Sequence, residues 1–229
     1  MIEPLESIEQ GIATADIWEK KGDLPQMQRC IEGALMGYLQ HAVRQPSFAE
    51  AVALLREHDM ERLLDRCLRG LTTLCDDVDA GRWPSSVIAG NYDHIVFSHV
   101  AWALGNRGQG VSFAEIARRA DVLELSTPFW QEYSRGVEAL LRGESYVPRE
   151  MRLRSHEKYW VSYLGLISAA SRGEPLDAAI QEVDVAFRRR NEQGKIDGDS
   201  YGIEGCADDP VRWDFRRDGL LAFIRRPCP

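Results

Sequence analysis

Three aspartates close to the end of one expected helix have the residue type and spacing to bind a cation. Asp76, Asp77 and Asp79 form the pattern Asp-Asp-x-Asp. Metal-dependent helical enzymes use a related run, Asp-Asp-x-x-Asp, because carboxylate oxygens are good ligands for Mg²⁺. The spacing here is one residue shorter, and no second acidic run is expected on a facing helix. A solvated acidic helix end and a binding site for a cationic partner are the alternatives.

A second acidic segment, between Gly194 and Asp209, partly fits a calcium-binding loop. It has aspartates at the first, third and twelfth positions, Asp197, Asp199 and Asp208, and a glycine at the sixth. Tyr201 is a poor ligand at the fifth position, and an aspartate at the twelfth is too short to replace the usual bidentate glutamate. Whether the loop binds a cation stays open, and an acidic surface loop is the alternative.

The charge of this loop favours a protein partner. Asp197, Asp199, Glu204, Asp208 and Asp209 against Lys195 alone give a net charge of −4, half of the −8 of the whole chain. Ordering such a loop costs backbone entropy, and a docking cationic surface offsets that cost most easily. Tyr201 and Trp213 add aromatic area for packing. We therefore expect these residues to bind a partner, together with Asp76, Asp77 and Asp79 where the fold brings them near.

Two further patterns predict no chemistry by themselves. His94 and His99 are five residues apart, which places them about 140° apart on a helix, so they suit the core or its rim better than a metal pair. Residues 111–125 match the first part of a bacterial helix-turn-helix at Ser112, Glu115, Ile116, Ala117, Ala120 and Val122. The expected recognition helix carries Glu124 and Glu132 against Arg135, which opposes contact with phosphates.

Helical periodicity accounts for most of the chain, which is therefore expected to be all-α. The expected helices cover residues 4–20, 25–43, 48–57, 60–78, 87–105, 112–120, 127–142, 155–170 and 176–188, and residues 211–226 form a last helix or a short strand. Ser47 and Asp59 are the expected N-caps of two of them. Gly105, Gly108 and Gly110 predict a flexible loop after residue 104.

The segment 87–105 is apolar on nearly every side. A helix of this kind is buried, so the others should wrap around it. The sequence thus predicts a single domain, residues 1–229, with about eight or nine helices around this central one. Its polar residues, Asn91, Asp93, His94 and His99, argue against a membrane span.

Composition narrows the class of partner. With a net charge of −8 and a pI near 5.2, the surface as a whole is a poor match for nucleic acid. The N-terminal MIEPLESIEQ does not read as a secretory signal, and five scattered cysteines suit a reducing cytoplasm. We expect no cofactor, and no motif names a reaction.

The central apolar helix, the segment EKYWVSYLGLI and the acidic loop followed by DDPVRWDFR resemble the immunity proteins of bacterial polymorphic and type VI toxin systems. The resemblance implies a cytoplasmic inhibitor, not an enzyme, which blocks its cognate toxin. A toxin that attacks nucleic acid carries a basic cleft, which an acidic inhibitor can fill. The alternatives are a transcriptional regulator with an internal helix-turn-helix, residues 112–135, and a metal-dependent helical enzyme that uses Asp76, Asp77 and Asp79.

Overall fold

The computed structural model describes residues 5–88, 91–119, 127–153, 160–192 and 215–225. Its regular elements there are all helical, as the sequence predicts, and nine α-helices accompany the central one, which agrees with the eight or nine expected around it. These are α1 (Leu5–Lys20), α2 (Leu24–Ala42), α3 (Phe48–Glu57), α4 (Met60–Asp79), the 3₁₀ helix η1 (Ser85–Ile88), α5 (Asn91–Leu104), α6 (Arg107–Ala117), α8 (Pro128–Arg142), α9 (Val161–Ser171), α10 (Asp177–Glu192) and α11 (Phe215–Arg225).

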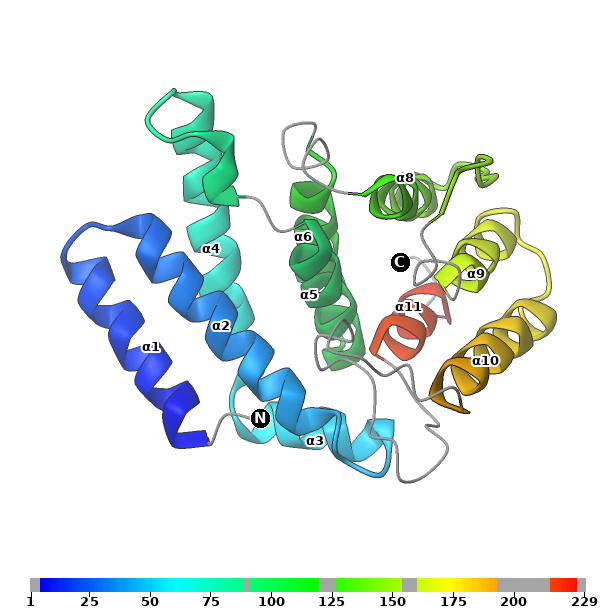
Figure 1. Cartoon of the computed structure of the whole chain (residues 1–229), viewed down its shortest axis with the longest axis horizontal. Coiled ribbons are helices and arrows are strands. Elements are labelled where there is room, and N and C mark those ends of the chain that lie inside the picture. The colour runs from blue at the N-terminus through cyan, green and yellow to red at the C-terminus, as the bar shows by residue number, and fades with distance from the viewer. Residues whose placement is uncertain (1–4, 89–90, 120–126, 154–159, 193–214, 226–229) are drawn as a thin grey trace.

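Helix α5 lies between two hydrophobic cores. Figure 1 shows α1–α4 on one side of it and α8–α11 on the other. The N-terminal core contains the buried side chains of α1–α4 together with Phe113 and Phe215, and the C-terminal core contains those of α8 and α9 with parts of α10 and α11. Each core takes side chains from α5, so this helix is the wall that they share.

The sequence of α5 explains its position. One stripe faces the N-terminal core and consists of Val96, Phe97, Val100, Ala101 and Leu104. A second stripe, Ile95 and Trp102, faces the C-terminal core. Val96, Val100 and Leu104 are 1%, 0% and 4% exposed, which confirms the expected central helix. A helix with apolar stripes on opposite sides has no face left for solvent.

The start of the central helix was predicted wrongly. Instead of one helix over 87–105, the chain forms η1 over Ser85–Ile88, and α5 begins at Asn91. The Val87 amide donates to the Pro84 carbonyl, the i to i+3 bond of a 3₁₀ turn. Ser85 and Ser86 therefore lie inside η1 and do not cap α5. The sequence Gly90-Asn91 is a turn signal that the apolar content of the segment concealed.

Local capping was predicted correctly at α3 but not at α4. The Ser47 hydroxyl accepts a hydrogen bond from the Glu50 amide at 3.2 Å, as an N-cap serine should. Asp59 precedes α4 with a left-handed backbone, φ 50°, and its side chain makes no capping bond. α4 instead depends on its buried face, which follows the expected periodicity from Met60 to Cys75.

The expected loop after residue 104 is the first part of α6. Asn106 caps this helix by accepting a hydrogen bond from the Gln109 amide at 3.1 Å. Gly108 and Gly110 thus lie inside a helix, where a flexible loop had been expected from them. Gly110 is needed for close packing, because a Cβ there would overlap the indole of Trp102 and the carbonyl of Ser98.

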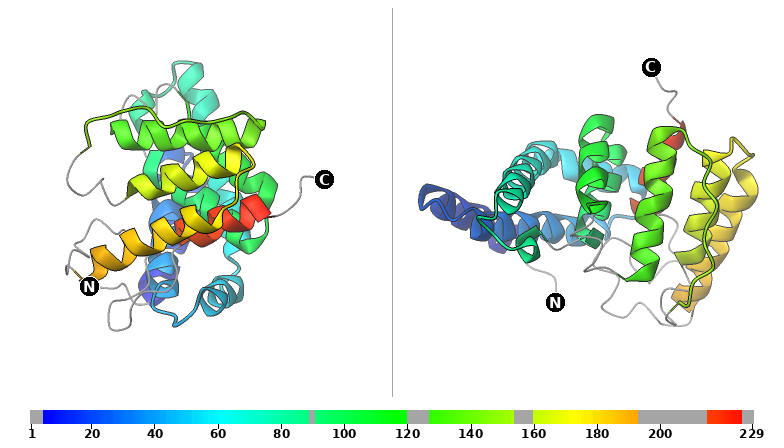
Figure 2. Two further views of the ribbon diagram at one scale, coloured as in Figure 1. Left: turned by 90° about the vertical axis from the view of Figure 1, so that its right-hand side faces the viewer. Right: turned by 90° about the horizontal axis from the view of Figure 1, so that it is seen from above.

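The C-terminal half contains one extended segment among its helices. Residues 144–153 follow α8 without regular structure and lead toward α9. The tail, for which helix and strand were both open, is the helix α11. It packs against α5 so closely that a Cβ at Gly219 would overlap the His99 carbonyl. Figure 2 shows these helices from two further directions.

The two α6 glycines provide a test of this packing. Gly110→Ala should lower the free energy of unfolding by about 1–3 kcal/mol, because its methyl group displaces Trp102 and the α5 backbone. Gly108→Ala is the matched control, since a Cβ at that position would meet nothing within 4 Å. Chemical denaturation of both variants measures the difference. Equal stabilities would contradict the close α5–α6 contact.

Candidate functional site

The three acids predicted at the end of α4 do lie together, and two of them are paired. We call Asp76, Asp77 and Asp79 the α4 acidic end. Asp77 accepts a hydrogen bond from Arg82 Nε at 2.8 Å, and Asp79 accepts one from Arg119 of α6 at 2.8 Å. Asp76 is exposed. The end of α4 thus presents carboxylates whose charge is only partly balanced by arginines.

An exposed tryptophan stands in the turn that follows this acidic end, four residues after Asp79. Trp83 is 40% exposed and lies between Asp79 and η1 in the chain. In Figure 1 the end of α4 and the turn after it stand at the edge of the molecule. Tryptophan is enriched at protein interfaces because its ring supplies a large packing area. Carboxylates followed in the chain by an exposed indole suit a cationic protein surface.

The other predicted binding residues lie outside the described part of the chain. They are Asp197, Asp199, Tyr201, Glu204, Asp208, Asp209 and Trp213. Among the described residues, no group of three or more His, Cys, Asp and Glu side chains is arranged to hold a metal ion.

Both central histidines are buried, as expected for core residues. His99 Nδ1 lies 2.5 Å from the Ile95 carbonyl, which can only accept, so Nδ1 donates. Nε2 forms a hydrogen bond with the Tyr133 hydroxyl at 2.8 Å. This bond links α5 to α8 and satisfies a polar group on the stripe that faces the C-terminal core.

His94 belongs to a buried polar cluster between α2, α4 and α5. The Gln28 amide donates to Glu32 Oε1 at 2.8 Å and to the Cys67 sulfur at 3.1 Å. His94 Nε2 lies 3.8 Å from the same Glu32 oxygen. Burial raises the pKa of the Cys67 thiol well above its ordinary value, so Cys67 is a poor nucleophile. The polar groups of this cluster contact one another, and its thiol is not activated for nucleophilic attack.

Asp93, on the first turn of α5, carries the clearest pH dependence. Burial raises its pKa to about 6, and the nearby Glu32 carboxylate adds to the effect. Because the pKa is higher in the folded state, this carboxyl stabilises the fold most below pH 4, and that stability is lost as the pH rises through about 6.

Asp93→Asn should therefore raise the free energy of unfolding at pH 8 by about 1–3 kcal/mol, and by less at pH 5. The reason is that the amide has no charge to bury. Denaturant titrations of both proteins across this pH range measure the difference. Asp76→Asn, at an exposed position of α4, is the control. A pH-independent difference between Asp93→Asn and the native chain would contradict the assignment.

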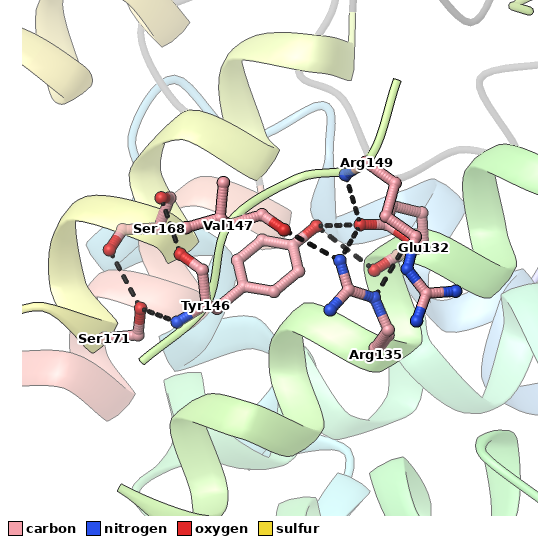
Figure 3. A network of polar contacts seen from close by, with 7 residues as sticks. All are labelled: Glu132, Arg135, Tyr146, Val147, Arg149, Ser168 and Ser171. Atoms are coloured by element: carbon pink, nitrogen blue, oxygen red, sulfur yellow. Dashed lines mark hydrogen bonds and ion pairs between the residues drawn. The ribbon is translucent and has the colours of Figure 1, made fainter. Parts of the chain in front are cut away.

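A buried carboxylate, Glu132 of α8, fastens the extended segment 144–153 to the helices (Figure 3). Its Oε1 accepts from the Tyr146 hydroxyl at 3.0 Å and from the Arg149 amide at 2.9 Å. Arg135 donates to both carboxylate oxygens, at 3.0 Å from Nε, and also to the Val147 carbonyl at 2.8 Å. One acid thus satisfies donors from three other residues.

The far side of the same segment is bound to α9. Ser168 Oγ donates to the Tyr146 carbonyl at 2.8 Å, and the Tyr146 amide donates to Ser171 Oγ at 2.9 Å. The Tyr146 ring packs on α8 where Gly136 leaves room, since a Cβ there would be 2.9 Å from the ring. Tyr146 therefore joins α8 to α9.

Electrostatics support a structural role for Glu132. Burial alone would raise its pKa, but hydrogen bonds from Arg135, Arg149 and Tyr146 outweigh burial and lower it. Burial, followed by the Glu132 charge, raises the pKa of Tyr146, which stays a donor. A carboxylate held ionised with its oxygens occupied is a poor general base.

Glu132→Gln should lower the free energy of unfolding by about 2–4 kcal/mol. The amide nitrogen of the new side chain would face hydrogen-bond donors, and Arg135 would lose its counter-charge. Amide hydrogen exchange should show the loss first in residues 144–153. Glu144→Gln, at an exposed position of the same segment, is the control. Unchanged exchange in that segment would contradict the fastening role.

The expected helix-turn-helix is built differently from its pattern. Its first helix, α6, begins at Arg107 rather than Ser112, and α8 buries Phe129, Tyr133 and Val137. The basic side chains are engaged, since Arg118 pairs with Glu138 at 2.6 Å and Arg119 with Asp79. Arg135 is held by Glu132. These arginines would have to exchange partners to reach phosphates.

A groove of about 640 Å³ lies between α1, α2 and α4. Ile12, Met27 and Leu63 give it apolar walls. Arg66 of α4 bridges to α1, with Asp16 at 2.6 Å and Glu19 at 2.7 Å. The groove contains an ion-paired rim but no activated nucleophile or acid–base pair.

Comparison of the chain with models of protein families, with curated proteins and with solved structures gives no match. Within the described ranges, the helices are too short or too polar for any of them to cross a membrane. Function must therefore be inferred from the residues themselves.

Three features of the structure were not predicted from the sequence. Glu132 and Gln28 lie within the inward-facing stripes of their helices, where a polar residue signals a buried hydrogen-bond network. Trp83 was not among the binding residues predicted from the sequence, because its exposure depends on the fold. Two partners of Glu132, Tyr146 and Arg149, come from a segment without periodicity, which no sequence pattern could place.

Proposed function

We propose that the chain is an immunity protein that binds a cognate bacterial toxin and blocks the toxin's active site with an acidic surface. The observation that carries the proposal is Trp83, which is 40% exposed and stands four residues after Asp79 of the α4 acidic end. An aromatic anchor beside carboxylates fits a basic protein surface. The net charge of −8 supports the same kind of partner through long-range attraction.

A toxin that cleaves nucleic acid fits this charge best. Such a toxin needs a cleft lined with Lys and Arg to hold phosphates. Carboxylates that occupy the cleft replace the phosphates and exclude the substrate. Cys30 and Cys67, in the described part of the chain, are free thiols, which suits action in a reducing cytoplasm.

The neighbouring reading frame provides the test. Its product should arrest growth when expressed alone, and co-expression of this chain should restore growth. The two purified proteins should bind, and Asp76→Asn/Trp83→Ala should weaken binding at least tenfold, since it removes a charge and an interface anchor. Glu50→Gln/Val147→Ala, at exposed positions elsewhere, is the matched control. A harmless neighbour, or growth arrest that this chain does not relieve, would contradict the proposal.

The loop between Gly194 and Asp209 is the second proposed contact, on the basis of its charge. Replacing Asp197, Asp199, Asp208 and Asp209 by Asn should slow association with the toxin and reduce its salt dependence, because steering by opposite charges is lost. The melting temperature should stay nearly unchanged. Association rates at two salt concentrations measure this effect, and an unchanged rate and salt slope would place the contact elsewhere.

A further inference from the structure

Helix α10 lies on the outside of the molecule with little of its surface covered. In the left view of Figure 2 it runs across the side that faces the reader. Of its described side chains, only Val183 is buried. Val185 is 39% exposed, and Glu182 and Arg189 are exposed as well. A helix of this kind has a face available to a partner.

The exposed face has a symmetrical order of residue types. Glu182, Val185, Ala186 and Arg189 follow one another at i, i+3, i+4 and i+7. Glu182 and Arg189 are therefore about 10.5 Å apart along the axis and within about 20° of one line. Val185 and Ala186 lie midway between them, on either side of that line. A hollow of about 400 Å³ adjoins the same four residues.

The order of charges on this face is complementary to itself. We propose that α10 pairs with α10 of a second copy of this chain, antiparallel, about a two-fold axis that passes between Val185 and Ala186. Glu182 of each copy then lies opposite Arg189 of the other, and the two small apolar side chains meet at the centre. One patch meets the same patch, as a closed two-fold dimer requires.

The charges select this arrangement over a parallel one. Parallel pairing in register would place Glu182 against Glu182 and Arg189 against Arg189, which is repulsive. In the part of the chain that the structure describes, no intramolecular ion pair engages Glu182 or Arg189, whereas Asp184 is held by Arg217.

The dimer should be weak. One face of a 16-residue helix covers less area than a standard protein interface, so we expect a Kd on the order of 10–100 μM. This surface is separate from the α4 acidic end and does not depend on the proposed function. Dimerisation through α10 is therefore expected whether or not the α4 acidic end binds a toxin.

A charge exchange tests the pairing. Sedimentation velocity from about 5 to about 500 μM spans the expected Kd. The native chain, 25.9 kDa as a monomer, should shift toward twice that mass, whereas Glu182→Arg and Arg189→Glu should each remain monomeric. The double variant Glu182→Arg/Arg189→Glu should dimerise again, because it restores the opposite charges. Circular dichroism confirms that each variant is folded.

Glu115→Arg, an exposed charge reversal on α6, is the control and should dimerise like the native chain. A native chain that stays monomeric over the whole range would overturn the proposal. So would single exchanges that leave dimerisation unchanged, or a double exchange that does not restore it.

Discussion

The fold depends on the burial of α5 between two cores. Val96 and Val100 fill one core, and Ile95 and Trp102 fill the other, so each core is incomplete without this helix. Its neighbours must then approach closely. This explains why glycine stands at position 110, beside Trp102, and at position 219, beside His99, where a Cβ would overlap α5. A charged residue on either stripe would lie in an apolar environment, at a cost that few domains of this size can absorb.

The polar groups inside the molecule serve this architecture. His99 joins α5 to Tyr133, Gln28 joins α2 to α4, and Glu132 fastens the extended segment to α8. Each satisfies a hydrogen-bonding group that packing has removed from water. The buried hydrogen-bonded groups His99, Gln28 and Glu132 thus join structural elements, whereas the described groups proposed to bind partners lie on the surface. This separation suits a protein whose function is binding.

Periodicity predicted the elements whose burial follows one stripe. α4 keeps its expected face for five turns and ends within a residue of its expected limit. The starts of α5 and α6 were predicted wrongly, because apolar content concealed a turn before Asn91 and glycines suggested a loop at Gly108. Glycine has two opposite uses, flexibility and close packing, and only the neighbouring helix decides between them. The exposure of Trp83 also depends on how the neighbouring elements pack, so the sequence alone could not predict it.

Because α5 belongs to both cores, the two cores should unfold together. Val100→Ala removes two methyl groups from the N-terminal core and should destabilise the protein by about 2 kcal/mol. Hydrogen exchange under native conditions should show equal losses of protection in α2 and α4 on one side and in α8 and α9 on the other, because neither core persists without α5. A loss confined to α1–α4, with α8 and α9 protected as before, would contradict this account.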